Sequence, residues 1–508
     1  MNAAFGSKLE LALQLPVGNL FGSREFGSRA VLLYLSTPAI IFLFSFTLLP
    51  IAIGAGVLIV AANTQIFIQE RHRKPALTWA GPLLGSLAML WIVGFTRGTF
   101  CWDWIKHWAL VNELANNEWP LVLNLDGVPQ YIRFYIGAYL PAALAHRLLP
   151  SLPTVFALGA WFGLGYVLVF RMVAGTTMRR HAAWASIILF SLIGGADFFV
   201  EHVTRLARGL PQLPLFGLHY ESWPVYAKGM PLEYSSMMTA LIWVPHQSIA
   251  TFLVAGMLIL RRDTQAFIAA TLGFGLLSLW SPYGMIGLLP LMLVTAYQQR
   301  GALKSLKAWL PVLAGTIFTL VIVSYLTTEI PSAGACFECI LARIDRLDAF
   351  FLFWLVELCV FVLILRTKIV RDIGCLVSLI TLLALPLMYG QTPDFVMRGS
   401  MGPLFVLSVR SVQMLLEKPS VPWSRLLHGI ALVLCVPAAV SQVVYQVEAG
   451  ATHRQLASAD PLNKQWMDTF ATRTDYTMQQ FLDICGWHYK GQYLSTKKPA
   501  IMRENVSN

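Results

Sequence analysis

Long, uninterrupted apolar segments recur along almost the whole chain, and they constrain its fold more than any other feature. Many are about 18 to 20 residues long, the length that an α-helix needs to cross a lipid bilayer. Only 12% of the 508 residues are charged, against about 25% in soluble domains. The segments are continuous rather than alternating, which argues against an outer-membrane β-barrel. The sequence therefore predicts an all-α polytopic membrane protein and excludes a soluble enzyme, a fibrous or disordered chain and a disulfide-rich secreted module.

The apolar pattern predicts about thirteen transmembrane helices, within a range of eleven to fourteen. The expected segments are Ala30–Leu48, Pro50–Ile68, Ala76–Phe95, Pro153–Phe170, Ala182–Val200, Trp243–Leu260, Ala266–Trp280, Gly284–Tyr297, Ala308–Leu326, Ala349–Leu365, Ile373–Tyr389, Met401–Leu416 and Leu426–Tyr445.

The basic residues indicate which side of the membrane each connection faces. They gather in every second connection, as in Arg71-His-Arg73-Lys74 and Arg261-Arg262. Cytoplasmic loops of membrane proteins carry such an excess of Lys and Arg. We therefore expect the protein to lie in the inner (plasma) membrane of a cell, with its N-terminus in the cytoplasm. The net charge of +11 then reflects topology, and no nucleic-acid partner is predicted.

This topology divides the chain into three parts. We expect a cytoplasmic N-terminus over residues 1–29, a transmembrane domain over 30–445 and an external C-terminal tail over 446–508. The large external, or periplasmic, loops are residues 96–152, 201–242, 328–348 and 390–400.

The first external loop carries a segment that is apolar enough to span. If Tyr131–Leu148 crossed the membrane, however, Arg179 and Arg180 would lie outside. We therefore expect an amphipathic helix on the outer surface.

Two groups of ionisable residues follow early spans on the external side. Asp103 and His107 lie four residues apart, so on a helix they share one face, where they could form a general base or only an ion pair. Asp197 ends an otherwise apolar span, where it needs a cavity, a proton or an arginine partner.

Two further groups lie on later external segments. His219, Glu221, His246 and Gln247 fall between two spans as candidate ligands or proton carriers, although single histidines are more often packed core residues. Asp394 and Arg398 precede Met401, where an arginine near a helix start suits phosphate, or the two pair with each other. Glu357, in mid-span, has no partner that the sequence identifies.

The cysteines and histidines do not predict a metal centre. The seven cysteines are scattered, and the histidines are too widely spaced for a convincing zinc site. Cys336 and Cys339 lie in an external loop, where they could form a disulfide.

The layout resembles the GT-C superfamily of polytopic glycosyltransferases. The likeness rests on a long external loop that begins with Asp103, on the Tyr131-to-Pro141 segment within it, and on the following order of span, basic turn and span that ends at Asp197 and Glu201. It covers residues 76 to 420 and is one of architecture. Two spans precede the first span of the family's layout, and no second acidic residue closely follows Asp103.

The resemblance implies inverting transfer of a sugar from a polyprenyl-phosphate-linked donor to a glycan, lipid or protein acceptor on the external face. Asp103 would be the base, His107 would orient it and Arg398 would hold the lipid phosphate. The remaining candidates, namely Asp197, His219, Glu221, His246, Gln247 and Asp394, would line the substrate pocket. Membrane lipids are further partners, and participation of Mg²⁺ or Mn²⁺ stays open.

Three other functions stay open. The main alternative is a transporter or flippase of lipid-linked saccharides, which would need charged groups at mid-membrane depth. An acyltransferase that uses His246 and a structural subunit of an envelope assembly complete the alternatives.

Overall fold

The computed structural model describes residues 28–69, 79–96, 100, 104–125, 127–176, 182–213, 215, 220–221, 232–260, 263–328, 347–366, 368–388, 394–417, 422–457, 474–485 and 493–503. Within these ranges the chain is mostly helical, with three short strands. A helix satisfies its own backbone N–H and C=O groups, which is what a lipid environment requires.

Eight helical stretches in the described ranges are long and apolar enough to cross a membrane. They are α2 (Ser28–Phe46), α3 (Leu49–Gln69), α7 (Thr154–Ala174), α8 with α9 (Ala182–Leu192 and Asp197–Ala207), α14 (Leu306–Leu326), α15 (Leu347–Leu365), α18 (Asp394–Leu416) and α19 (Pro422–Ala457). The chain therefore has the helices that an all-α membrane protein needs.

Shorter helices complete the bundle. They are α4 (Ala80–Val93), α10 (Met237–Trp243), α11 (Pro245–Leu260), α12 (Thr264–Leu276) with the 3-10 turn η2 (Leu277–Leu279), α13 (Pro282–Gln298), η3 (Ala302–Lys304), α16 (Lys368–Arg371) and α17 (Ile373–Ala384) with η5 (Leu385–Met388). Each of the thirteen predicted apolar segments contains one of the bundle's helices. How many of them cross a membrane stays a prediction.

The outward faces of the bundle are apolar. On α3, Leu49 and Val57 are 65% and 60% exposed, and on α14 Leu320 is 63% exposed. A soluble protein rarely leaves such residues in continuous exposed patches, whereas lipid-facing helices do so routinely. The exposed surface thus agrees with a bundle that sits in a bilayer.

One predicted span is interrupted, which corrects the expectation of a single helix over Ala182–Val200. The helix α8 ends at Leu192 and α9 begins at Asp197, with Gly194 and Gly195 between them. The backbone groups freed by the break find partners nearby, since the N–H of Ala196 donates to the carbonyl of Val356 over 3.1 Å.

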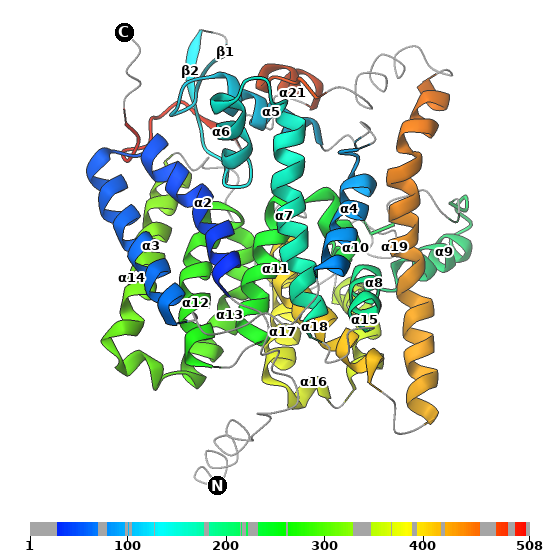
Figure 1. Ribbon diagram of the computed structural model, residues 1–508. Coiled ribbons are helices and arrows are strands. Elements are labelled where there is room, and N and C mark those ends of the chain that lie inside the picture. The colour runs from blue at the N-terminus through cyan, green and yellow to red at the C-terminus, as the bar shows by residue number, and fades with distance from the viewer. Residues whose placement is uncertain are drawn as a thin grey trace.

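The described part of the predicted first external loop forms a cap at one end of the bundle, and α16 lies at the other end (Figure 1). The cap contains α5 (Trp104–Asn116), a hairpin of β1 (Val122–Leu125) and β2 (Val128–Ile132), and α6 (Leu140–Leu148). The expected surface helix over Tyr131–Leu148 is therefore wrong in its first half. The signal for the hairpin in the sequence is the pair Asp126-Gly127, which is typical of a two-residue turn, and Gly127 has a φ of 76°.

The C-terminal tail completes this cap. The strand β3 (Leu494–Ser495) pairs antiparallel with β2, Leu494 facing Ile132, so the sheet has the order β1-β2-β3. The short helix α21 (Met478–Cys485) lies near α5 (Figure 1), and the Met478 N–H donates to Glu113 over 2.8 Å. The helix α19 runs to Ala457 and so continues past residue 446, where the external tail was expected to begin.

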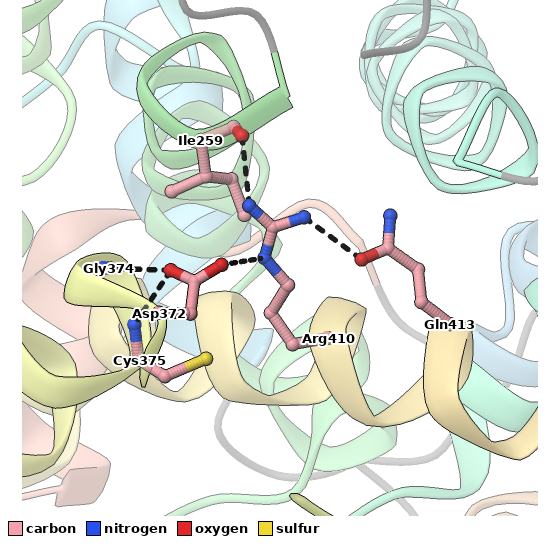
Figure 2. A network of polar contacts seen from close by, with 6 residues as sticks. All are labelled: Ile259, Asp372, Gly374, Cys375, Arg410 and Gln413. Carbon is pink, nitrogen blue, oxygen red and sulfur yellow. Dashed lines mark hydrogen bonds and ion pairs between the residues drawn. The ribbon is translucent and has the colours of Figure 1, made fainter. Parts of the chain in front are cut away.

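A largely buried ion pair between Arg410 and Asp372 anchors the helix α18 (Figure 2). The Nε of Arg410 lies 3.3 Å from a carboxylate oxygen of Asp372, and the guanidinium also donates to Gln413 and to the carbonyl of Ile259. The other oxygen of Asp372 accepts from the backbone at the start of α17. Arg410 therefore joins α18 to α17 and α11.

Candidate functional site

Arg398 is the cation in the first group of polar side chains, which we call the arginine cluster: Arg398, Tyr135, Gln247, His246, His107 and Tyr139. The guanidinium of Arg398 donates a hydrogen bond to the hydroxyl of Tyr135. The amide of Gln247 donates to the same hydroxyl over 3.2 Å. Arg398 is only 6% exposed, and a cation held at so dry a place attracts an anion more strongly than it would in water.

A chain of hydrogen bonds fixes the orientation of Gln247. The N–H of Gly284 donates to the hydroxyl of Ser281, and that hydroxyl donates to the amide oxygen of Gln247 over 3.2 Å. The amide nitrogen then lies 2.9 Å from Nε2 of His246 and donates to it. In this orientation Nε2 of His246 is an acceptor, so the neutral ring carries its proton on Nδ1. Nδ1 is buried and has no hydrogen-bond partner among the described residues.

The two histidines of the cluster come from different elements, and their rings lie close together at a tilt of 56°. The ring centres of His107, on α5, and His246, on α11, are 4.5 Å apart. Nδ1 of His107 lies 2.6 Å from the hydroxyl of Tyr139. Burial and the positive charges of Lys106 and Arg398 lower the pKa of His107 well below its ordinary value, against the opposing effect of a hydrogen bond to the Trp243 backbone. His107 is therefore neutral at physiological pH.

Two helices that begin with proline position the residues of this chain of hydrogen bonds. Pro245 begins α11, so His246 and Gln247 fall in its first turn, and Pro282 begins α13 directly after its N-cap Ser281. Proline favours the first helical position because its fixed φ suits the helix and its missing N–H is not needed there.

A second group of buried side chains consists of acids, and we call it the carboxylate cluster: Asp197, Glu221, Glu233 and Glu357. A Cβ atom on Gly195 would lie 2.4 Å from a carboxyl oxygen of Glu357 and 2.6 Å from one of Asp197. These two acids form a hydrogen bond with each other, which requires a proton on one of them. The break between α8 and α9 thus makes room for two acids at a position where only glycine fits.

Glu221 approaches the same cluster from the segment between α9 and α10. One of its oxygens accepts from the N–H of Ser236 over 2.8 Å, at the N-cap of α10. Burial and the adjoining charge of Asp197 raise the pKa of Glu221 to about 7, although hydrogen bonds from Ser236 and Thr239 partly oppose this. The Ser235 hydroxyl donates to Glu233 over 2.9 Å. A small pocket beside these acids is lined by residues that include Gly194, Gly195, Ser235, Ser236 and Glu357.

The two clusters lie at opposite ends of α10. Glu221 binds the backbone at Ser236, before the helix, and His107 binds the backbone of Trp243, its last residue. A helix of seven residues is about 10 Å long. The clusters are therefore neighbours.

Four of the predicted site residues meet in the arginine cluster: His107, His246, Gln247 and Arg398. Asp197 and Glu221 belong to the carboxylate cluster, so the structure distributes the predicted substrate pocket over two places. Asp103, His219 and the side chain of Asp394 lie outside the described residues. Arg398 lies inside α18, in its second turn, because that helix begins at Asp394 rather than at Met401.

Sequence reasoning missed several members of both clusters. Tyr135 and Tyr139 stand four residues apart in the first loop, but tyrosines are common at membrane surfaces and gave no distinct signal. Ser281 lies between two predicted spans and gave no signal of a role in the site. Glu357 stood out as an acid in mid-span, and only the structure supplies its partner Asp197.

Within the described ranges, no three His, Cys, Asp or Glu side chains are arranged to hold a metal ion.

Comparison of the chain with protein-family models, with curated proteins and with solved structures finds no match.

Proposed function

We propose that this protein is an integral membrane glycosyltransferase. It moves a sugar from a polyprenyl-phosphate-linked donor to an envelope glycan, lipid or protein acceptor, by inverting displacement at the external face of the inner membrane. The site lies where the cap meets the helical bundle, a position that a lipid-linked donor can reach from the bilayer.

The observation that carries this proposal is the arginine cluster. Arg398 and the Nδ1–H of His246 are hydrogen-bond donors in a dry environment, and they come from α18 and α11. Two donors of this kind, one of them a cation, favour a phosphate group that gains charge as it leaves. Tyr135 holds Arg398 and Gln247 holds His246 through the bonds described above, so little reorganisation accompanies the reaction.

The reaction follows from these roles. The acceptor hydroxyl attacks the anomeric carbon of the donor sugar, and a new C–O bond forms as the bond from that carbon to the phosphate oxygen breaks. The phosphate leaves with the bonding electrons, next to Arg398. Asp103, which directly precedes α5, takes the hydroxyl proton, and His107 orients the base from the first turn of that helix.

The resemblance to the GT-C layout supports the same proposal. A loop after an early span, beginning with an acid and followed by amphipathic helices, is the layout on which that likeness rests. The amphipathic helices α5 and α6 occupy the corresponding stretch of this chain.

A transfer assay tests the proposal. Purified protein in lipid nanodiscs receives polyprenyl-phosphate donors that carry radiolabelled hexoses or pentoses, together with extracted envelope glycans and lipids. We expect label to move to the acceptor fraction, and to stay on the donor when Arg398→Gln replaces the wild type. Equal transfer by wild type and Arg398→Gln would exclude the assigned phosphate site.

The carboxylate cluster favours a second candidate, a proton-coupled transporter or flippase of lipid-linked saccharides. Asp197 and Glu357 share a proton inside the bundle, and Glu221 titrates near neutral pH. Buried acids of this kind are used as proton carriers in membrane transporters. Flipping of a labelled lipid-linked saccharide in proteoliposomes, accelerated by a pH gradient and lost in Glu357→Gln, would favour this candidate over transfer.

A further inference from the structure

The C-terminal strand reaches the arginine cluster through a stack of aromatic rings. The ring of Tyr493 lies 4.6 Å from that of Phe134, and the ring of Phe134 lies 3.8 Å from that of Tyr135. Tyr135 accepts the hydrogen bonds of Arg398 and Gln247. The stack therefore connects the C-terminal end of the chain with the cation that the proposed function assigns to the phosphate.

The backbone of the same strand fixes the position of this stack. The N–H of Arg133 donates to the carbonyl of Tyr493 over 2.6 Å, and Tyr131 pairs with Ser495. Tyr493 itself is 4% exposed and also meets the ring of Phe481, on α21, at 5.4 Å. Tyr493 is thus held on both sides, and it limits where Phe134 and Tyr135 can lie.

The C-terminal tail also contacts α5, the second element of the cap that carries a site residue. The amide of Asn112, on α5, donates to the carbonyl of Thr474 over 2.6 Å, and Glu113 accepts the N–H of Met478. His107 lies on the same helix, between one and two turns earlier. The tail therefore contacts both α5 and the segment after β2, which supply the histidine and the tyrosines of the cluster.

We propose that Tyr493 is a positioning residue, through which the C-terminal residues 474–485 and 493–503 hold Tyr135 and, with it, Arg398 in the geometry that binds phosphate. The identity of the ligand rests on the proposed function, whereas the mechanical link rests on the contacts above. Aromatic pairs add modest energy to simple burial, so loss of the ring is expected to loosen the stack while the fold remains.

Two variants separate the effect of the aromatic ring of Tyr493 from the effect of an apolar side chain at this position. Tyr493→Phe keeps the ring, and Tyr493→Leu keeps an apolar side chain without it. The matched control is Met502→Ala, which truncates an equally buried side chain (2% exposed) of the same tail at a place where the backbone pairs with Thr47. All proteins carry 3-fluorotyrosine at position 135 only, and they are studied as full chains in nanodiscs.

The first measurement, the ¹⁹F resonance of residue 135, needs no ligand. We expect Tyr493→Leu to shift and broaden it, and Tyr493→Phe and Met502→Ala to leave it near the wild-type position. The second measurement is the Kd for a long-chain polyprenyl monophosphate, which should weaken about three- to tenfold in Tyr493→Leu and less than about twofold in the other two.

These measurements distinguish two kinds of failure. A wild-type ¹⁹F resonance in Tyr493→Leu overturns the positioning role, whatever binds. If the resonance shifts in Tyr493→Leu but the wild type does not bind polyprenyl phosphate, the link stands and the proposed ligand is wrong. If Tyr493→Leu is not recovered in folded form, Phe134→Leu interrupts the same stack at its next ring and is measured in its place.

Discussion

The hydroxyl of Tyr135 accepts a hydrogen bond from Arg398, although the two residues are 263 positions apart in the chain. Tyr135 belongs to the cap, whereas Arg398 belongs to a helix of the bundle. The contact therefore joins the two parts of the fold at the point where the candidate site is assembled.

Arg398→Lys tests the role of the guanidinium. Lysine keeps the charge but not the planar fork, so we expect transfer to fall by about ten- to a hundredfold, with little change in Tm. The matched control is Arg410→Lys, because Arg410 lies on the same helix with the same exposure of 6% but binds Asp372. That variant should lower Tm and leave transfer per folded molecule within about twofold. Equal activity losses in both variants would contradict the assignment.

Asp103→Asn tests the proposed base. The amide cannot take up the acceptor proton, so transfer should fall by about 10² to 10⁴ while abundance in the membrane stays unchanged. Asp263→Asn serves as the control, since Asp263 caps α12 through the Ala266 N–H and asparagine caps equally well. Full activity of Asp103→Asn in the labelled-donor assay would remove Asp103 from the mechanism.

Glu221→Gln tests the raised pKa of Glu221, which is about 7 against an ordinary value of 4.5. A raised folded-state pKa contributes stability that is complete below the unfolded value and is lost as the pH rises through 7. Glutamine does not ionise, so the variant should lose less stability than the wild type between pH 5 and pH 8.5. Thermal unfolding in nanodiscs at several pH values measures this, and parallel Tm curves would contradict it.

Gly195→Ala tests whether the break between α8 and α9 exists to admit the acids. The new Cβ would lie within 2.6 Å of oxygens on both Glu357 and Asp197, so these side chains must move, at a cost of about 1–3 kcal/mol. Gly54→Ala, on α3, is the control because its Cβ would meet nothing within 4 Å, and a helical alanine there should add about 0.5–1 kcal/mol. The same direction of change in both variants would show that the acids do not require the glycine.

The helices could be predicted from the sequence because a membrane-spanning helix has simple requirements. Spans need only length and low polarity, and all thirteen predicted segments contain a helix. The cap was harder, since it combines helices with a hairpin whose third strand comes from the far end of the chain. Pairing between β2 and Leu494 leaves no trace in a single sequence, because the register depends on contacts made only after folding.

The candidate site was partly predictable for the same reason. Ionisable side chains near a membrane cost free energy, and that cost makes three of them stand out in the sequence, namely His107, His246 and Arg398. Tyr135 and Ser281 carry no such cost, so their part in holding Gln247 appears only in three dimensions.

The central claim is that the arginine cluster binds the phosphate of a polyprenyl lipid, and a paired binding measurement tests it most directly. Wild type and Arg398→Lys in nanodiscs are titrated with a polyprenyl monophosphate and with the matching polyprenol, which lacks the phosphate. We expect the wild type to prefer the phosphate by at least about tenfold, and Arg398→Lys to lose most of that preference. If the wild type binds both lipids equally, or if Arg398→Lys keeps the full preference, the claim is contradicted.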